Sequence, residues 1–339
     1  MVKYILLFWV CLLANYQSFA QSISVTEQGR ATSIRGLSIV NNKIIWVSGS
    51  KGSVGISLNG GQTWAWQQVK GFEQSDFRDI EAFSAKEAVI MSSGTPALIL
   101  RTMDGGANWI VCYRNADEAY FLDGLAFFNK KHGIAMGDPI NGRFVLLETA
   151  DGGNKWTELK TGPEALKNEA AFAASGTSVS IVNKNTNAVL LTGVAVSRLW
   201  FNNAKLNSWT ALNVPLAHGD ASKGGFSIAQ GNNRTVLVGG NYSSDKRTDS
   251  VACFYEGDLM KNKLMYLSSA MPQGYQSCVT YVNQQIFLST GTSGTNITRD
   301  GGLTWKLIDD GSYNVCKASK AGNLIVLAGE KGRIALFKL

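Results

Sequence analysis

One short pattern recurs along the chain and constrains its fold more than any other feature. It consists of Ser or Thr, any residue, Asp, two glycines, two further residues and Trp. Intact copies are TMDGGANW (102–109), TADGGNKW (149–156) and TRDGGLTW (298–305), and SLNGGQTW (57–64) carries Asn in place of Asp. The closing tryptophans are 45, 47 and 149 residues apart, and the last gap is close to three periods. A period of this length predicts a repeat architecture.

The segments around each DGG pattern have the composition of short β-strands. A β-prone run such as DFRDIEAF (76–83) leads into a second run rich in small residues, AVIMSSG (88–94). A third run, ALILRT (97–102), precedes the DGG turn, and a fourth run follows the Trp. Four strands in each period of about 45 residues, without an amphipathic helical pattern, predict an all-β chain folded as a β-propeller.

Counting these units predicts seven blades in a single domain, residues 21–339. A misreading of residues 160–275 would change the number to six or eight. The last blade shows only three strands, and ISVTEQ (23–28) is expected to supply its fourth strand, which removes an open sheet edge. The seven predicted blades span 34–69, 77–112, 122–160, 170–214, 224–268, 276–309 and 313–339.

The acids in the repeated pattern are predicted to build turns and not to perform chemistry. An Asp side chain accepts hydrogen bonds from backbone N–H groups just ahead of it, and two glycines permit the positive φ of a tight connection. Asn59 fits the same role through its carbonyl oxygen, whereas a metal ligand or catalytic acid tolerates that exchange less well. The residues assigned to this structural role are Asn59, Trp64, Asp104, Trp109, Asp151, Trp156, Asp300 and Trp305.

The first twenty residues predict a secretory signal peptide. Lys3 is followed by a nearly continuous apolar run, and Ser18-Phe19-Ala20 has small residues at the positions that precede a cleavage site. We therefore expect cleavage after Ala20, a secreted or periplasmic protein, and no membrane span. The net charge of +7 is scattered without a basic block, which argues against a nucleic-acid partner. We expect a monomer.

Cofactor and metal chemistry find little support in the sequence. Cys112, Cys253, Cys278 and Cys316 form no CxxC pair, so no zinc site is expected. Cys278 and Cys316 occupy matching positions in adjacent inner strands, but a disulfide requires Cα atoms within about 7 Å. The chain has two histidines and lacks nucleophile, zinc-protease and nucleotide motifs. We expect no cofactor.

The predicted binding site lies at the mouth of the central channel. Arg35, Arg78, Asp123 and Ser277 occupy equivalent positions in the aligned inner strands. Two interpretations remain open: arginines that hold an anionic group, or a set of mutually satisfied ion pairs. The candidate binding residues are Arg35, Asp76, Arg78, Asp79, Asp123, Asp138, Arg143 and Glu169.

A glycoside hydrolase is the enzymatic alternative, because such catalysis needs only two carboxyl groups at a suitable separation. Asp79, Asp123 and Glu169 are the candidates for that pair. Sialidases and xyloglucan-type glycosidases share the repeated turn, but the Arg-Ile-Pro signature of sialidases is absent.

The repeated pattern is similar to the Asp-box, or bacterial neuraminidase repeat. Together with DFRDIEAF, GDPINGRF (137–144), AFAASGTS (171–178) and GEKGRIALFKL (329–339), it resembles the seven-bladed propellers of the photosystem II stability/assembly factor type, especially their exported bacterial relatives. The resemblance implies an assembly or binding role without known catalysis. It also implies an arginine patch that contacts a partner protein and that corresponds here to Arg35, Arg78 and Arg143. The expected function is therefore a non-catalytic scaffold that recognises a protein or an anionic ligand, such as a glycan, at the channel mouth.

Overall fold

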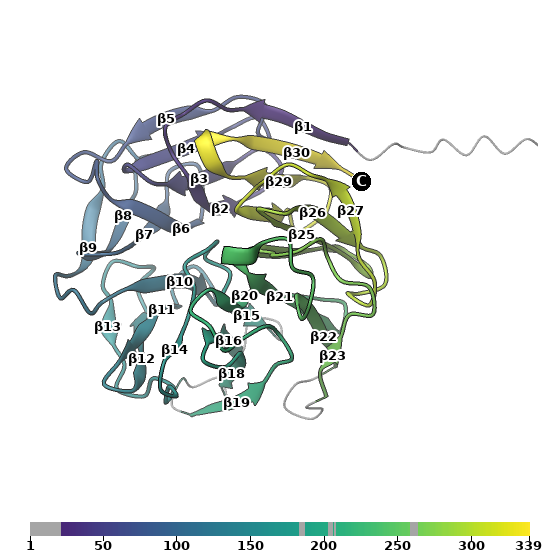
Figure 1. Cartoon of the computed structure of the whole chain (residues 1–339). Coiled ribbons are helices and arrows are strands. Elements are labelled where there is room, and N and C mark those ends of the chain that lie inside the picture. The colour runs from purple at the N-terminus through teal and green to yellow at the C-terminus, as the bar shows by residue number, and fades with distance from the viewer. Residues whose placement is uncertain (1–21, 183–186, 203–205, 207, 258–263) are drawn as a thin grey trace, which may run out of the picture.

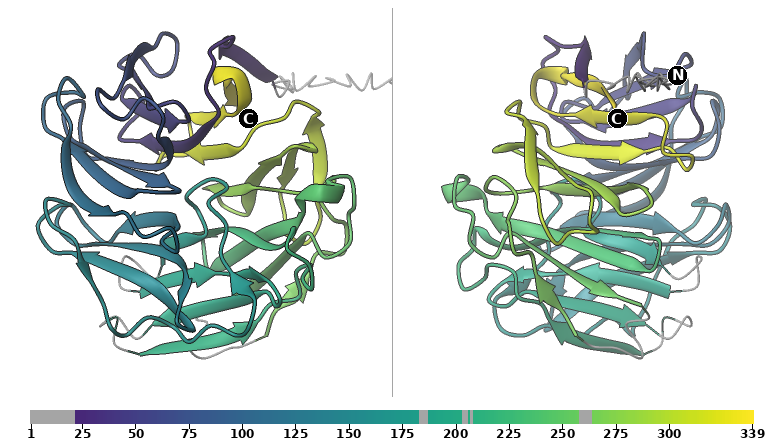
Figure 2. Two further views of the ribbon diagram at one scale, coloured as in Figure 1. Left: turned by 60° about the vertical axis from the view of Figure 1, so that its left-hand side comes forward. Right: turned by 90° about the vertical axis from the view of Figure 1, so that its right-hand side faces the viewer.

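Seven antiparallel β-sheets are arranged as blades around a central channel (Figure 1). The computed structural model describes residues 22–182, 187–202, 206, 208–257 and 264–339, so the predicted signal peptide lies outside the described residues. The turned views in Figure 2 show the sheets following one another around the ring. The predicted seven-bladed all-β fold is confirmed.

The first three blades follow the predicted boundaries. Blade 1 consists of β2 (Ile34–Ile39), β3 (Ile45–Gly49), β4 (Ser53–Ser57) and β5 (Ala65–Gln68). Blade 2 consists of β6 (Asp76–Ala82), β7 (Ala88–Ser93), β8 (Ala97–Thr102) and β9 (Ile110–Asn115). Blade 3 consists of β10 (Leu122–Phe127), β11 (Gly133–Ile140), β12 (Arg143–Thr149) and β13 (Thr157–Glu158).

Blades 4 and 5 depart from the prediction at one point. Blade 4 consists of β15 (Val179–Val182), β16 (Asn187–Leu191), β18 (Arg198–Asn202) and β19 (Trp209–Asn213). It therefore begins at residue 179 and not at residue 170. The preceding segment pairs elsewhere, because β14 (Glu169–Ala170) joins β17 (Gly193–Val194) at the inner edge of blade 5. The other strands of blade 5 are β20 (Lys223–Gly231), β21 (Arg234–Asn241), β22 (Ala252–Glu256) and β23 (Tyr266–Leu267).

The chain closes the ring by joining its N-terminal strand to its C-terminal strand. Blade 6 consists of β24 (Cys278–Asn283), β25 (Ile286–Gly291), β26 (Gly294–Thr298) and β27 (Lys306–Asp309). Blade 7 consists of β28 (Val315–Ala318), β29 (Ile325–Ala328), β30 (Ile334–Lys338) and β1 (Ser22–Glu27). Ile23 pairs with Phe337 in the β1–β30 ladder, as the missing fourth strand of the sequence predicts. Two short 3₁₀ helices, η1 (Tyr242–Ser244) and η2 (Glu330–Gly332), lie in connections.

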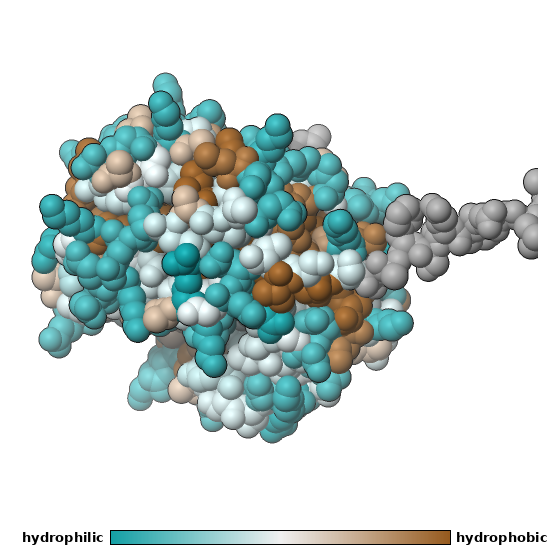
Figure 3. Space-filling model, turned by 90° about the horizontal axis from the view of Figure 1, so that it is seen from above, coloured by the Kyte–Doolittle hydropathy of each residue, from teal (hydrophilic) through white to brown (hydrophobic). Residues whose placement is uncertain are grey.

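The hydrophobic core is divided among the spaces between neighbouring blades. One cluster joins Ile34 of blade 1, Leu288 of blade 6 and Phe337 of blade 7. Trp46 illustrates such a contact between blades, since its indole N–H donates to the carbonyl of Ser84 at 3.0 Å. On the rim shown in Figure 3, hydrophobic side chains form separate patches between hydrophilic ones. In the described ranges no helix is long and apolar enough to span a membrane.

The four DGG segments form turns of one design at the ends of their strands. In TMDGGANW the Thr102 hydroxyl accepts the Gly106 N–H at 2.9 Å, and Asp104 Oδ1 accepts the Asn108 N–H at 2.9 Å. The hydrogen bonds from the backbone N–H and the side-chain amide of Asn108 lower the pKa of Asp104. Gly106 has a φ of +89°, which only glycine adopts without strain. In the other three copies the N–H of the second glycine, which is Gly61, Gly153 or Gly302, likewise donates to the Ser or Thr hydroxyl.

Candidate functional site

The central channel has two mouths that are separated by a segment of the chain itself. The inner strands of the seven blades contact one another in a closed ring from β2 through β28 and back to β2. Residues 171–177 connect β14 with β15 and lie between the two ends of this channel. We call residues 171–177 the plug. A pocket of about 410 Å³ lies at the end where the inner strands begin, and a second pocket of about 320 Å³ lies where they end.

β-bulges determine which side chains reach the first pocket. The register of the inner strands shifts by one residue at Arg35, Arg78, Asp123 and Phe226, so each of these residues is the extra residue of a bulge. A bulge bends the strand and changes the direction in which the side chain of the extra residue points. Arg35, Arg78 and Phe226 consequently line the first pocket, and Asp123 does not. The sequence analysis attaches no role to Phe226.

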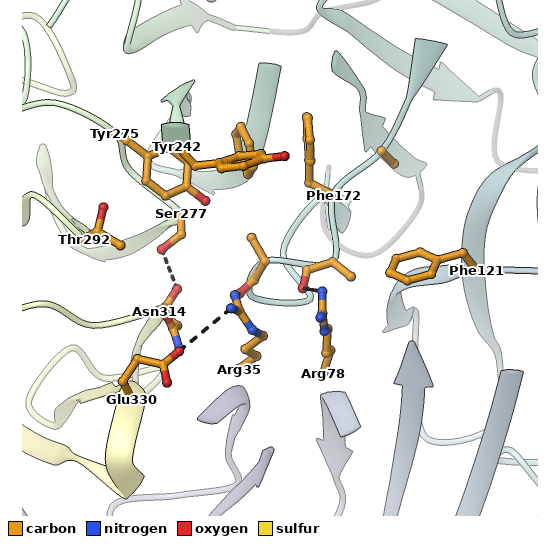
Figure 4. Close-up of a pocket in the computed structure, with 14 residues that line it drawn as sticks. Arg35, Arg78, Phe121, Phe172, Tyr242, Tyr275, Ser277, Thr292, Asn314 and Glu330 are labelled. Carbon is orange, nitrogen blue, oxygen red and sulfur yellow. Dashed lines mark hydrogen bonds and ion pairs between the residues drawn. The ribbon is translucent and has the colours of Figure 1, made fainter. Parts of the chain in front are cut away.

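The two arginines contact the plug (Figure 4). Arg35 Nη1 donates to the Ala174 carbonyl at 3.2 Å, and Arg78 Nη1 reaches the Ala173 carbonyl at 3.5 Å. Arg78 Nε also donates to Asp76 Oδ2 at 2.8 Å. The nearest carboxylate to Arg35 is that of Glu330, at 4.0 Å and largely exposed. Among the residues that the structure describes, Arg35 thus has only this long ion pair, whereas Arg78 has a close carboxylate partner in Asp76.

The electrostatic environment of Arg35 favours an additional negative charge. Burial and the neighbouring Arg78 guanidinium lower the pKa of Arg35. Like charges held together without full compensation are unfavourable, and a guanidinium retains its charge at physiological pH. A bound anion would relieve this repulsion.

An aromatic cluster forms the opposite wall of the same pocket, as Figure 4 shows for three of its four rings. Phe172 of the plug stacks on Phe226, with ring centroids 3.9 Å apart. Tyr242 in η1 and Tyr275 meet Phe226 edge to face at 6.3 and 4.8 Å. The pocket therefore has a cationic side and an apolar aromatic side. The sequence analysis did not identify this wall, because its residues come from four separate segments without a shared pattern.

Asp79 and Asp123 are buried and lie outside the arginine pocket. Asp79 Oδ2 accepts the Leu125 N–H at 2.7 Å and Oδ1 accepts the Ile80 N–H at 2.8 Å. Burial raises the pKa of Asp79 to about 7. Neither carboxyl oxygen of Asp123 has a hydrogen-bond partner in the part of the chain that the structure describes. Burial, followed by the charge of Asp138, raises the pKa of Asp123.

Glu169, Asp138 and Arg143 have structural partners. Glu169 Oε1 accepts hydrogen bonds from Arg198 Nε at 2.9 Å and from the Thr192 hydroxyl at 2.5 Å. Asp138 Oδ1 accepts the Ala171 N–H at 3.0 Å and so holds the start of the plug. Arg143 donates to the Gly162 carbonyl at 3.1 Å and pairs with Glu164. Of the eight candidate binding residues, the structure brings only Arg35 and Arg78 into the lining of the first pocket, with Asp76 paired to Arg78, and Asp79 lines the second pocket.

The candidate carboxylates of a glycoside hydrolase do not meet in an open cleft. Asp79, Asp123 and Glu169 are 7%, 0% and 3% exposed, and none lines the arginine pocket. Within the described ranges, no group of three or more His, Cys, Asp and Glu side chains is arranged to hold a metal ion.

Comparison with known proteins places the fold among propellers. No model of a known protein family matches the chain, and no curated protein does. A structure described as YCF48 bound to D1 peptide is similar with a TM-score of 0.65 and 14% identity, covering 94% of this chain and 95% of that one. YCF48 from Cyanidioschyzon merolae has a TM-score of 0.68 and 15% identity, with coverage of 93% and 98%.

A propeller of another kind is also similar in structure. The Pan2 WD40 domain of Neurospora crassa has a TM-score of 0.61 and 12% identity, with coverage of 91% of this chain and 89% of that one. At such low identity the comparisons establish a shared propeller fold. Function has to be argued from the pocket.

Proposed function

We propose that this chain is a non-catalytic binding propeller that recognises an anionic segment of a partner protein in the Arg35–Arg78 pocket. The observation that carries the proposal is the pair of neighbouring guanidinium groups, of which Arg35 has no carboxylate closer than 4.0 Å. Arginine suits this role because its planar donor array binds carboxylate or phosphate in a bidentate manner.

The aromatic wall favours a peptide over a purely ionic ligand. Phe172, Tyr242 and Tyr275 offer apolar area opposite the arginines. A segment that carries an acidic group next to an apolar side chain would satisfy both sides of the pocket. The solved structure described as YCF48 bound to D1 peptide is a propeller of the same fold with a peptide ligand, which supports a protein partner for this chain as well. The photosystem is not thereby proposed as the partner.

Export is part of the proposal and depends on the N-terminal sequence. The apolar run after Lys3 and the small residues up to Ala20 support cleavage of a signal peptide and a secreted or periplasmic location. Amino-terminal sequencing of the protein recovered from the envelope of an expressing bacterium tests this. A mature protein that begins at Gln21 is the expected result, and a protein retained in the cytoplasm with its first twenty residues would contradict it.

An array of acidic and neutral peptides tests the binding function. Wild type should bind a subset of the acidic peptides, and the double variant Arg35→Ala/Arg78→Ala should lose that binding. Arg143→Ala is the matched control, because Arg143 pairs with Glu164 away from the pocket. Equal binding by wild type and the double variant would contradict the proposal.

A hydrolysis screen over glycans separates this proposal from the enzymatic alternative. We expect no turnover by wild type. Turnover that Asp123→Asn abolishes would establish the glycoside hydrolase and refute the binding module.

A further inference from the structure

The pocket at the far end of the channel has a different character from the arginine pocket. Its volume is about 320 Å³, and its walls include Leu37, Leu125, Ile228 and Val279. Glu81 and Lys317 also line it and form an ion pair at 3.8 Å. The arginines and the aromatic wall lie on the other side of the plug. Polar groups make up most of the surface of the far pocket, and its volume is large enough for a small molecule.

A pair of cysteines lies beside this far pocket. Cys278 begins β24 and Cys316 lies in β28, the inner strands of adjacent blades. Both residues are buried, and Cys316 belongs to the pocket lining. The Cys278 thiol donates to the carbonyl of Cys316 at 3.2 Å, and the Cys316 thiol donates to the carbonyl of Leu288 at 3.6 Å. The side chain of Cys278 therefore lies against the main chain of Cys316.

The surroundings of the pair favour removal of one proton. Burial raises the pKa of each thiol, but for Cys278 the polar groups of Cys316, Thr177 and Ser175 outweigh burial and bring the pKa to about 6. The Thr177 hydroxyl reaches Cys278 Sγ at 3.7 Å. The pKa of Cys316 is raised, mainly by burial and then by the neighbouring Cys278. Two coupled thiols release their protons in two separated steps, and a thiolate is the reactive form.

The other described cysteines lack these features. Cys112 lies half-buried in β9, where burial raises its pKa. Cys253 is buried in the core between blades 4 and 5, and its pKa is also raised. Neither residue lines the far pocket.

We propose that Cys278 and Cys316 form a reactive dithiol that small disulfides reach through the far pocket and oxidise to an intramolecular disulfide. A cysteine thiolate attacks one sulfur of the small disulfide, which forms a mixed disulfide and releases one small thiol. The second cysteine, as its thiolate, attacks the protein sulfur of this mixed disulfide and releases the second small thiol. The protein loses two protons and two electrons, and the small disulfide gains them.

The test uses the full chain with Cys112→Ser and Cys253→Ser, which leaves the pair as the only described cysteines. The folded protein is incubated with bis(2-hydroxyethyl) disulfide, denatured, alkylated with iodoacetamide and digested. We expect loss of alkylation at both Cys278 and Cys316 and a cross-linked peptide that joins them, which dithiothreitol removes. Full alkylation of both residues after the incubation, or a mixed disulfide that persists on one of them, would overturn the proposal.

Two further variants test the route to the dithiol. Ala318 lies two residues after Cys316 in β28 and lines the far pocket, so its side chain lies on the same face of the strand. Ala318→Trp should slow oxidation by roughly tenfold or more, which corresponds to about 1.4 kcal/mol of added barrier. Ala65→Trp, at an exposed position of β5, is the matched control and should leave the rate unchanged. An unchanged rate in Ala318→Trp, with the fold intact by circular dichroism, would refute access through the far pocket.

Discussion

Arg35 Nη1 donates a hydrogen bond of 3.2 Å to the backbone carbonyl of Ala174, so an inner strand of blade 1 holds the plug that divides the channel. Asp138 holds the beginning of the same segment from blade 3 through the Ala171 N–H. Arg35 thus both binds the plug and lines the arginine pocket. A ligand bound to Arg35 would therefore be coupled to the position of the plug.

Inorganic phosphate should stabilise the wild-type protein more than the variant Arg35→Ala/Arg78→Ala. A ligand that binds only the folded state adds RT ln(1 + [L]/Kd), which is about 1.4 kcal/mol at ten times Kd. The measurement is the thermal unfolding midpoint over a phosphate titration at constant ionic strength. Arg143→Ala should respond as wild type does. Parallel curves for wild type and the double variant would contradict anion binding at this pocket.

Thr102→Val should destabilise the second blade by about 1–3 kcal/mol. The substitution removes the hydroxyl that accepts the Gly106 N–H at 2.9 Å and leaves a buried donor without a partner. Urea unfolding followed by tryptophan fluorescence measures the loss. Thr102→Ser keeps the hydroxyl and is expected to cost much less, and equal losses in the two variants would count against the turn as the cause.

The stability of the folded chain should fall between about pH 4 and pH 7 through Asp79. Its pKa is about 7 in the folded state and close to 4 in an unfolded chain, so the folded state retains a proton that the unfolded state has released. Stability then decreases with rising pH by at most about 1.4 kcal/mol per unit across that window. The comparison is urea unfolding of wild type and Asp79→Asn over this range. The variant should show a shallower decline, and an unchanged slope would assign the pH dependence to other groups such as Asp123.

Arg198→Met should destabilise the protein by about 3–5 kcal/mol, because it leaves the buried carboxylate of Glu169 without its cation. The double variant Glu169→Leu/Arg198→Met removes both charges and should recover much of this loss. Urea unfolding of wild type, the single variants Arg198→Met and Glu169→Leu and the double variant gives the coupling between the two side chains. A double variant that is less stable than Arg198→Met would contradict the unpaired carboxylate as the cause of the loss.

The fold could be predicted from the sequence because the same turn pattern recurs in several blades. Each DGG turn marks the same place in its blade, so a few copies locate most strands and leave β1 to pair with the free edge of β30. The alignment of inner strands also placed Arg35 and Arg78 at equivalent positions, and in the structure both are bulge residues. A pattern that repeats along the sequence can be recognised without knowing which distant residues are in contact.

The plug and the aromatic wall could not be predicted from the sequence in this way. Residues 171–177 occur once, so no repeat reveals that they leave the blade and cross the channel. Phe172, Tyr242 and Tyr275 meet only because the ring brings three separate segments together. Arg143 was a candidate binding residue because of its place in a motif. The motif gave no indication that its guanidinium binds Glu164 and the Gly162 carbonyl.

The β1–β30 ladder has a consequence for the order of folding. Residues 22–27 pair with residues 334–338, so this strand has no partner until nearly all of the described chain has been synthesised. Joining segments so distant in sequence carries a large loop-closure entropy, and such contacts form slowly. Until then β1 and β30 each expose an unpaired edge. Ring closure is therefore the step at which a nascent molecule is most open to pairing with another copy, and the closed ladder ends that exposure.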